Sequence, residues 1–382
     1  MSSVSLLIKK GFGATLFPLW AGLLALPFAG LKNSLWIALA AGAALVLAKL
    51  AKTGPIALHL NTLSEIVSRS GTAVLPRIAS VNSRAILSLT ALLLIILPLF
   101  LNDYYRDIMT LTGMYIVLAL GLNLVVGQVG ILNLGYVAFY AVGAYTYAIL
   151  STSFGLSFWP GLVAGALSSA FFATLLGLST LRLRGDYFAI VTLGLGEITR
   201  IVLNNWDSLT GGPNGIANIN KPVIAGYTLH TTLDFYYLIL AIAMLTVFTM
   251  HRLMVSRIGR AWIAIREDET AAEAMGINTF RLKLLAFVLA SAWAGIVGVF
   301  FASKMAFVSP ESFTFLESVM ILCMVVLGGM GSIPGIILGA LLLITLPEVF
   351  RDFQDYRMLA FGAALVLMMV FRPQGLLGTV KR

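Results

Sequence analysis

The sequence has 382 residues, of which 59% are hydrophobic and only 11% are charged, and its formal net charge is +9 at pH 7. A chain this apolar, with a mean hydropathy of +0.97, lies outside the range of soluble domains and is expected to be an integral membrane protein. In such a protein a positive charge is typical of cytoplasmic loops, and no basic run interleaved with aromatic residues indicates nucleic-acid binding.

Long uncharged stretches predict many membrane crossings. Residues 108–181 and 318–347 contain no Lys, Arg, Asp or Glu, and a bilayer core takes about 20 helical residues per crossing. The apolar stretches between charge clusters predict twelve segments, at 12–31, 33–48, 86–102, 108–126, 131–151, 159–181, 187–203, 235–250, 284–303, 318–329, 333–347 and 358–371. The expected fold is all-α, a polytopic transmembrane helix bundle of about 10–12 spans.

The chain is expected to have two parts. Residues 1–85 form an N-terminal extension with two predicted spans and a basic cytoplasmic loop, and residues 86–382 form the main transmembrane domain. The uncharged stretch after Lys9 and Lys10 has no clear small-x-small cleavage site, which favours an uncleaved first span over a signal peptide.

Glycine-containing segments refine this picture. The spacings Gly161-x3-Gly165 and Gly335-x3-Gly339 predict close approach of helix backbones. The short segments in 318–347 flank a Gly-rich link, and they form either two spans or a re-entrant pair, whose irregular backbone must be buried or line a cavity.

The distribution of basic residues predicts the orientation. With the N-terminus in the cytoplasm and every segment crossing, the inner loops hold 18 of the 25 Lys and Arg residues. The outer loops then hold six, Lys32, Arg106, Lys221, Lys304, Arg351 and Arg357. This bias places both termini in the cytoplasm.

Motifs for chemistry are sparse. No G-x4-G-K-[ST] loop is present, so the chain has no phosphate-binding loop for ATP. The three histidines, His59, His230 and His251, lack the spacing of a metal site, and Cys323 is a lone cysteine in an apolar segment. We therefore expect no catalytic residue, no metal site and no cofactor bound by this chain. An intramembrane enzyme remains an alternative for which no residue is nominated.

Two groups of polar residues are candidates for a substrate pathway. Glu197 and Arg200 are spaced to share one helix face, where they form either part of a pathway or a solvated pair near the outer loop. Asn123, Gln128 and Asn133 surround a Gly-broken junction of two spans. Such a break exposes helix ends that can bind a zwitterion, but amide side chains also serve as hydrogen bonds between helices.

One cytoplasmic stretch is rich in charge. REDETAAEAMG, residues 266–276, contains strong helix formers and ends at Gly276, a common stop residue. A surface helix is expected, with an apolar side made of Trp262, Ile263, Ile265, Ala272 and Met275. That side either packs on the protein's own helix ends or is presented to the groove of a partner.

This stretch resembles a known motif. Ala271-Ala272-x3-Gly276 is similar to the EAA loop of ABC importer permeases, in which a short coupling helix docks into an ATPase, although Thr270 stands where that loop has Glu. Longer stretches resemble the LivM family of permease subunits from about residue 86 to the end. They are ALGLNLVVGQVGILNLGYVAFYAVGAY (119–145), LRLRGDYFAIVTLGLGEITRI (181–201), LTGGPNGI (209–216), GRAWIAIREDETAAEAMGI (259–277), FVSPESFTFLESVMILCMVVLGGMGS (307–332) and YRMLAFGAALVLMMVFRPQGLL (356–377).

The resemblance implies a permease subunit of an ABC importer in the bacterial inner membrane, which moves leucine, isoleucine and valine inward by alternating access. The implied partners are a second permease like LivH, two ATPases like LivG and LivF that hold ATP and Mg, and a periplasmic binding protein. On a coupling helix near 262–276, the implied ATPase-coupling residues are Arg266, Glu269, Ala271, Ala272, Glu273 and Gly276. A permease for urea or short amides is the alternative within this class. A secondary transporter, for which Glu197 is the candidate coupling carboxylate, is the alternative outside it.

Overall fold

The chain divides into two compact units, Met1–Leu93 and Leu94–Arg382. The computed structural model describes residues 94–349, except 182, 184 and 225, together with 362, 375 and 376. The segments predicted at 12–31 and 33–48 and the basic loop of residues 49–84 lie outside the described residues, as does the segment at 358–371 except for Gly362. The boundary between 85 and 86 stays a prediction.

The described residues are mainly helical, as the composition predicts. The α-helices are α4 (Asp103–Asn123), α5 (Val137–Phe154), α6 (Phe158–Thr180), α7 (Asp186–Asn205), α8 (Asp207–Thr210), α9 (Thr232–Val255), α10 (Arg257–Glu267), α11 (Glu269–Ala274), α12 (Thr279–Met305), α13 (Phe315–Gly328) and α14 (Ile333–Val349). Shorter turns are η1 (Leu97–Phe100), η3 (Gly212–Asn214) and η4 (Pro310–Ser312), and η2 (Leu124–Val129) is a π-helix. Two antiparallel strand pairs join β1 (Ile216–Ala217) to β4 (Phe307–Val308) and β2 (Val223–Ile224) to β3 (Tyr227–Thr228). The all-α prediction is confirmed.

Six helical segments within the described residues are long and apolar enough to cross a membrane. They are Asp103–Val129, Val137–Phe154, Phe158–Thr180, Thr232–Val255, Thr279–Met305 and Pro310–Gly328, and Ile333–Thr345 is a shorter apolar helix. The segment predicted at 187–203 forms α7 but is not among the six. The total of 10–12 spans includes segments outside the described residues.

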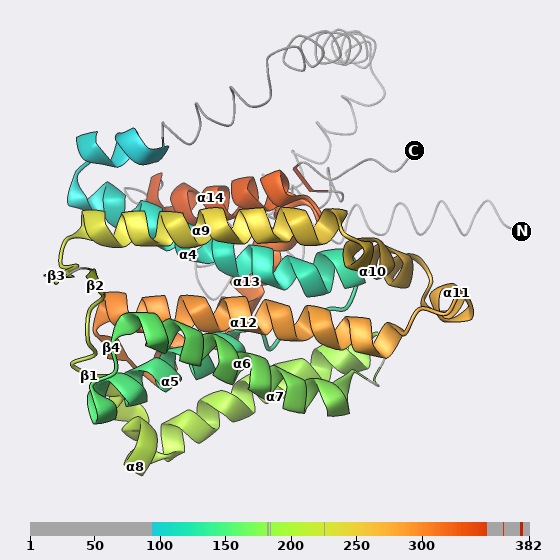
Figure 1. Ribbon diagram of the computed structural model, residues 1–382, viewed down its shortest axis with the longest axis horizontal. Coiled ribbons are helices and arrows are strands. Elements are labelled where there is room, and N and C mark those ends of the chain that lie inside the picture. Colours follow the sequence, from blue (N-terminus) through green and yellow to red (C-terminus); the bar gives the residue numbers. More distant parts are fainter. Residues whose placement is uncertain are drawn as a thin grey trace, which may run out of the picture. The chain divides into compact units, whose positions relative to one another are not determined.

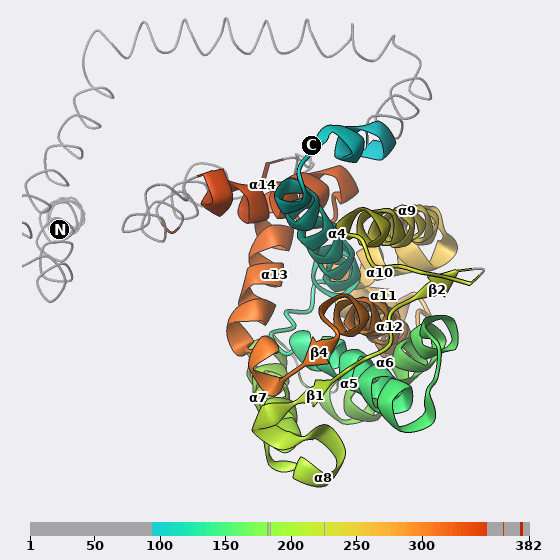
Figure 2. The ribbon, with the colours of Figure 1, turned by 90° about the vertical axis from the view of Figure 1, so that its left-hand side faces the viewer.

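The long helices form two groups, which Figures 1 and 2 show as separate layers. We call α4, α9 and α14 the first group, because α4 packs against both of the others. The second group is α5, α6 and α12, which pack against one another. Glycine permits a very close contact in the second group, since a Cβ on Gly143 would overlap the backbone of Gly295. The two groups meet where α12 contacts α4.

The predicted close approach at the two small-residue spacings is confirmed. A Cβ on Gly161 would overlap the ring of Tyr147, and one on Gly165 would overlap Val299. A Cβ on Gly335 or Gly339 would likewise come too close to the α13 backbone. Glycine at these positions lets α6 contact α5 and α12, and α14 contact α13.

The helices α13 and α14 form a hairpin with an unusual direction. Figure 2 looks along the long helices and shows α13 lying across them. The chain reaches α13 through the irregular stretch 306–314, in which Val308 and Phe313 are buried. At the other end of α13 the backbone N–H of Gly331 donates to Asn123 Oδ1 at 2.8 Å. Both ends of α13 are thus held by contacts within the protein, and the choice between two spans and a re-entrant pair stays a prediction.

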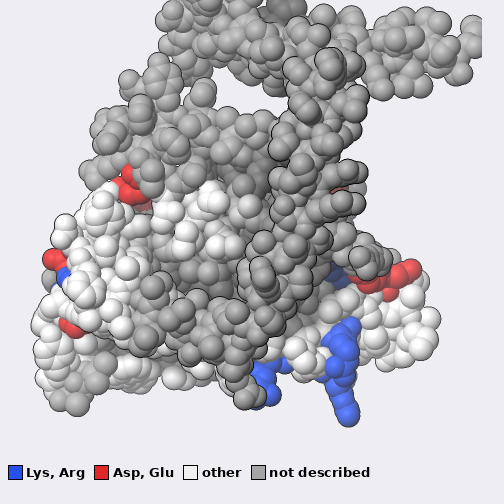
Figure 3. Space-filling model, turned by 90° about the horizontal axis from the view of Figure 1, so that it is seen from above, with Lys and Arg blue, Asp and Glu red and all other residues white. Residues whose placement is uncertain are grey.

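The loops between the long helices gather at two opposite ends. The helices α10 and α11 lie at one end of the long helices, and the strand pairs and α8 lie at the other (Figure 1). Residues Leu183 and Asp186 line the same cavity as Arg266 and Lys283, so two of the predicted inner loops are neighbours. In Figure 3 most of the described surface is uncharged, and the larger groups of Lys and Arg atoms lie in the right-hand half, on the side of α10 and α11.

Candidate functional site

The coupling helix expected near 262–276 is two helices, because the chain breaks at Asp268. The α10 helix ends at Glu267, and Asp268 adopts an extended conformation with a φ of −155°. Its carboxylate accepts hydrogen bonds from the backbone N–H groups of Thr270 and Ala271, which makes it the N-cap of α11. These two bonds also hold the pKa of Asp268 below its ordinary value. The prediction of one continuous helix was wrong, since the capping bonds start a new helix here.

The predicted stop at Gly276 is confirmed. Its φ of +82° is in the left-handed region, where glycine carries no steric cost. The N–H of Ile277 donates to the carbonyl of Ala272, and the N–H of Gly276 donates to that of Glu273. This pair of bonds is the Schellman motif, which satisfies the last carbonyls of a helix.

The sequence left open whether the apolar side of this segment packs on the protein or is presented to a partner. The structure shows some of these side chains buried and others exposed. Trp262, Ile265 and Ala272 are buried, and the indole N–H of Trp262 donates to the carbonyl of Leu282. In contrast, Met275 is 82% exposed. Ile263 is exposed on the same segment. Part of the apolar side therefore fixes α10 and α11 to the protein, and part is exposed on the surface of the chain.

The two carboxylates of α11 are bound to α12. Glu269 Oε1 lies 2.5 Å from Lys283 Nζ, and the side chain of Lys283 is only 8% exposed. Glu273 Oε1 accepts a hydrogen bond of 2.6 Å from the hydroxyl of Thr279. Thr270 and Ala271, in contrast, are exposed and free of such contacts to α12. The exposed face of α11 therefore carries the uncharged residues Thr270, Ala271 and Ala274 together with the exposed carboxylate of Glu273, and Met275 follows it.

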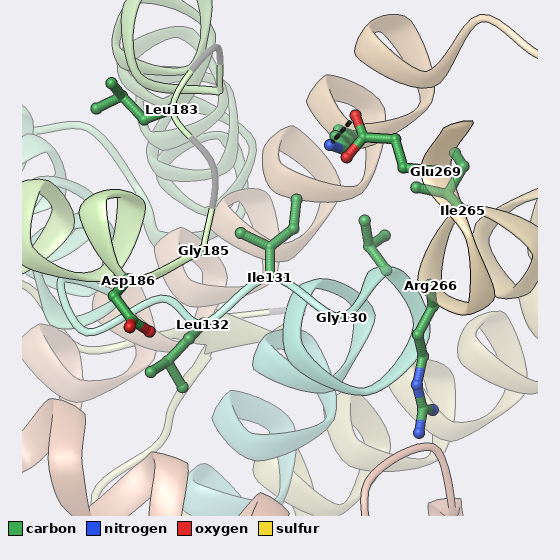
Figure 4. Close-up of a pocket in the computed structure, with 11 residues that line it drawn as sticks. Gly130, Ile131, Leu132, Leu183, Gly185, Asp186, Ile265, Arg266 and Glu269 are labelled. Carbon is green, nitrogen blue, oxygen red and sulfur yellow. Dashed lines mark hydrogen bonds and ion pairs between the residues drawn. The ribbon is translucent and has the colours of Figure 1, made fainter. Parts of the chain in front are cut away.

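Arg266 points in a different direction. Its guanidinium donates to the carbonyl of Gly127 in η2 at 2.5 Å. Its side chain lies directly against Gly130, where a Cβ would come within 2.9 Å of Arg266 Cγ. Figure 4 shows Arg266 and Glu269 extending away from each other. Arg266 thus binds the end of α4 rather than the outward surface.

A cavity of about 390 Å³ lies beside these contacts. Its lining comes from the α10–α11 segment, from the loop after η2 and from the start of α7, namely Val129, Gly130, Ile131, Leu132, Leu183, Gly185, Asp186, Ile265, Arg266, Glu269 and Lys283 (Figure 4). Charges of both signs border it. The cavity leaves space between the last turn of η2 and the first turns of α12.

The three amide side chains proposed for the pathway are almost fully buried. Asn123 is 2% exposed, Gln128 3% and Asn133 1%. Asn123 accepts from Gly331, and Asn133 Oδ1 accepts from the N–H of Gly135 at 3.0 Å. Asn123 thus joins two distant backbone segments, whereas the bond of Asn133 is local and its buried Nδ2 has no hydrogen-bond partner among the described residues. The role of the amides in a pathway stays a prediction.

Glu197 and Arg200 form the expected pair on one helix face. Their side chains are about one-third exposed and lie 3.1 Å apart. A third charge, Glu311, approaches Arg200 at 3.8 Å from the turn before α13. Of the candidates for a pathway, this cluster is the more accessible.

Sequence reasoning missed two charged residues. Glu317, which directly precedes the uncharged stretch 318–347, accepts a hydrogen bond of 2.5 Å from the hydroxyl of Tyr115. Lys283 was counted only as an inner-loop charge. Lys283 lies four residues after Thr279, the first residue of the apolar helix α12. A lysine one turn inside an apolar helix is the sequence signal for a buried cation here.

Comparison with known proteins identifies the family. Residues 104–371 match the family described as branched-chain amino acid transport system / permease component. The chain is 46% identical to the high-affinity branched-chain amino acid transport system permease protein LivM of Escherichia coli strain K12, over 80% of this chain and 77% of that protein. The LivM protein of Salmonella typhimurium is 47% identical over the same shares.

A second type of relative is more distant. The permease protein LivH of Escherichia coli strain K12 is 28% identical over 73% of this chain and 96% of that protein. No solved structure matches the chain. The family model covers the helices that build the two groups and the α10–α11 segment. The chain belongs to the family of permease components of branched-chain amino acid transport systems.

Proposed function

We propose that this chain is the membrane-spanning permease subunit of an ATP-driven importer for leucine, isoleucine and valine. Its multi-pass helices and its family membership support the permease role. The names of the LivM relatives support the substrate class. The proposed location is the bacterial inner membrane, with both termini in the cytoplasm, because most basic residues fall in the loops assigned to that side.

The partners follow from what the chain lacks and from its relatives. A chain without a phosphate-binding loop needs separate ATPase subunits, which would hold ATP and Mg. The likeness to both LivM and LivH proteins supports pairing with a second, LivH-like permease. An external binding protein would deliver the amino acid. The Glu197–Arg200–Glu311 cluster carries charges of both signs, which suit the carboxylate and ammonium groups of such a substrate.

The observation that carries the coupling role is the outward surface of α11. Met275 is 82% exposed directly after α11, a helix that is anchored to the protein by the buried Ala272. Thr270, Ala271 and Ala274 are also exposed on this helix, and Glu273 adds one exposed carboxylate. A short helix with one protruding apolar side chain suits insertion into a groove of a partner. We assign this surface to the ATPase.

Replacement of Met275 with Glu tests this assignment. The variant is expected to retain its membrane abundance, since the side chain has no buried contact, but to lose co-purification with tagged ATPase subunits. Met305→Glu is the matched control, because Met305 is also exposed (51%) but lies at the opposite end of α12. Normal ATPase capture by Met275→Glu would contradict the docking surface.

The transport function is tested in proteoliposomes that hold the complete complex with the binding protein. Radiolabelled leucine is expected to enter only with ATP present, and isoleucine and valine are expected to compete. Competition by urea or acetamide instead would favour the short-amide alternative. Uptake without ATPase subunits would favour a secondary transporter.

A further inference from the structure

The α10–α11 segment joins the two helix groups by sequence and by side-chain contacts. It follows α9 of the first group and precedes α12 of the second. Arg266 binds the carbonyl of Gly127 in η2, which directly continues α4 of the first group. Glu269 binds Lys283 on α12, in the second group. A displacement of this segment therefore acts on both groups.

The contact of the α10–α11 segment with the second group is a short and nearly buried ion pair between Glu269 and Lys283. The side chain of Lys283 is 8% exposed, so its charge depends on Glu269 as the carboxylate that pairs with it. A second contact, the Glu273–Thr279 hydrogen bond, also joins α11 to α12, because Thr279 lies one turn before Lys283 on α12. In the apolar segment after Lys283, α12 packs against α5 and α6, with Gly295 against Gly143. A helix packed this closely moves with its neighbours rather than bending alone.

The space beside the contact permits movement. The cavity of about 390 Å³ is lined by Lys283 and Glu269 on one side and by the loop after η2 on the other. It lies where the first group, through η2, faces the second. A rotation of α12 relative to α4 at this end would change the cavity without unpacking either group.

We propose that Lys283 is the positioning residue that passes movement of α11 to α12, and hence to the second helix group. The inference rests on the proposed function, because α11 moves when the ATPase subunits to which it docks open and close. Glu269 then acts within this chain, as the partner of Lys283, and the ATPase contact is left to the exposed residues around Met275. Loss of the ion pair leaves docking intact but separates ATP hydrolysis from transport.

A charge exchange tests the proposal in the complete complex. Glu269→Lys and Lys283→Glu are made singly and together, and leucine uptake per ATP hydrolysed is measured in proteoliposomes. Each single variant is expected to capture the ATPase subunits normally and to lose uptake per ATP by about tenfold, within the range of coupling effects between sites. The double variant restores the opposite charges and is expected to recover most of the ratio.

Lys304→Met is the matched control. Lys304 is a second nearly buried lysine of α12 (9% exposed) and pairs with Asp107 at 2.7 Å, but at the opposite end. Its uptake per ATP is expected to equal that of the wild type. An equal loss in Lys304→Met would mean that any lost ion pair of α12 has this effect, and it would overturn the proposal.

Other outcomes are also decisive. Loss of ATPase capture by Glu269→Lys without rescue in the double variant assigns Glu269 to the partner and overturns the proposal. If the single variants fail to reach the membrane, the double variant decides the question. Recovery of both membrane abundance and uptake per ATP supports the proposal. Recovery of membrane abundance without recovery of uptake per ATP overturns it. Failure of the wild-type complex to take up leucine would reject the proposed function, whereas a change confined to the variants concerns Lys283 alone.

Discussion

The hydroxyl of Tyr115 donates to the carboxylate of Glu317 at 2.5 Å and joins the middle of α4 to the first turn of α13. A carboxylate in an apolar hairpin is costly unless it is paired or hydrogen-bonded. Two features compensate for this cost. Tyr115 supplies a donor, and the N-terminal turn of α13 carries a partial positive charge. The contact therefore contributes to holding the tilted helix in place.

Loss of this donor is expected to destabilise the protein. Tyr115→Phe should lower the free energy of unfolding by about 1–3 kcal/mol, because the carboxylate loses a partner in a partly buried site. Glu317→Gln should cost less, since the amide oxygen still accepts from Tyr115. The measurement is the thermal unfolding midpoint of the detergent-solubilised protein. The double variant should cost less than the sum of the two, and strict additivity would show that the groups do not interact.

Close glycine contacts in the second helix group give a further prediction. Gly143→Ala places a methyl group against the backbone of Gly295, so α5 and α12 must separate. We expect a destabilisation of about 1–3 kcal/mol, the usual cost of overpacking, seen as a lower unfolding midpoint. Gly194→Ala is the control, because Gly194 is helical and has no neighbouring atom within 4 Å of the added Cβ. Equal midpoints for the two variants would contradict the tight contact.

The sequence predicted features that depend on composition and local spacing. Uncharged stretches located most of the described membrane-spanning helices, Gly276 marked the end of α11, and the spacing of Glu197 and Arg200 indicated a pair. These are properties of a helix and its immediate neighbours in the chain.

Features that depend on distant contacts were not predicted. The turn after α13 is held by Asn123, which is 208 residues away in the chain from Gly331, and no local pattern shows such a bond. Asp268 also looks like an ordinary residue of a charged helix, because an N-cap is recognised only once the break is known. The charge of Lys283 was assigned to a loop for the same reason, since its burial follows from the folding of α11 onto α12.

The cap at Asp268 predicts a pH dependence. Its folded pKa is below the unfolded value of about 3.9. The stabilisation of α11 is therefore complete above the unfolded pKa and is lost as pH falls through the lower folded pKa. Amide hydrogen exchange at Thr270 and Ala271 should accelerate as pH falls through that range, after correction for the intrinsic rate. Asp268→Asn, which caps without titrating, should lack this acceleration. The same pH profile in both proteins would show that another group is responsible.

The charge cluster on α7 gives a prediction for transport. If Arg200 binds the substrate carboxylate, Arg200→Gln should raise the KM for leucine by about tenfold or more, because a hydrogen bond to a charged group contributes about 1.5–3 kcal/mol. ATPase capture should not change, since α7 is not part of the outward surface of α11. Uptake is measured against leucine concentration in proteoliposomes at constant ATP.

Arg106→Gln provides the matched control for this experiment. Arg106 forms an ion pair of the same spacing with Asp103, at 2.8 Å, in the first turn of α4. It also donates to the carbonyl of Pro98, a contact that fixes the start of the helix. The variant should lower the unfolding midpoint and leave the KM for leucine unchanged. Equal KM values for Arg200→Gln and the wild type would remove Arg200 from the substrate pathway and leave its pair with Glu311 as a contact that holds α7 near the turn before α13.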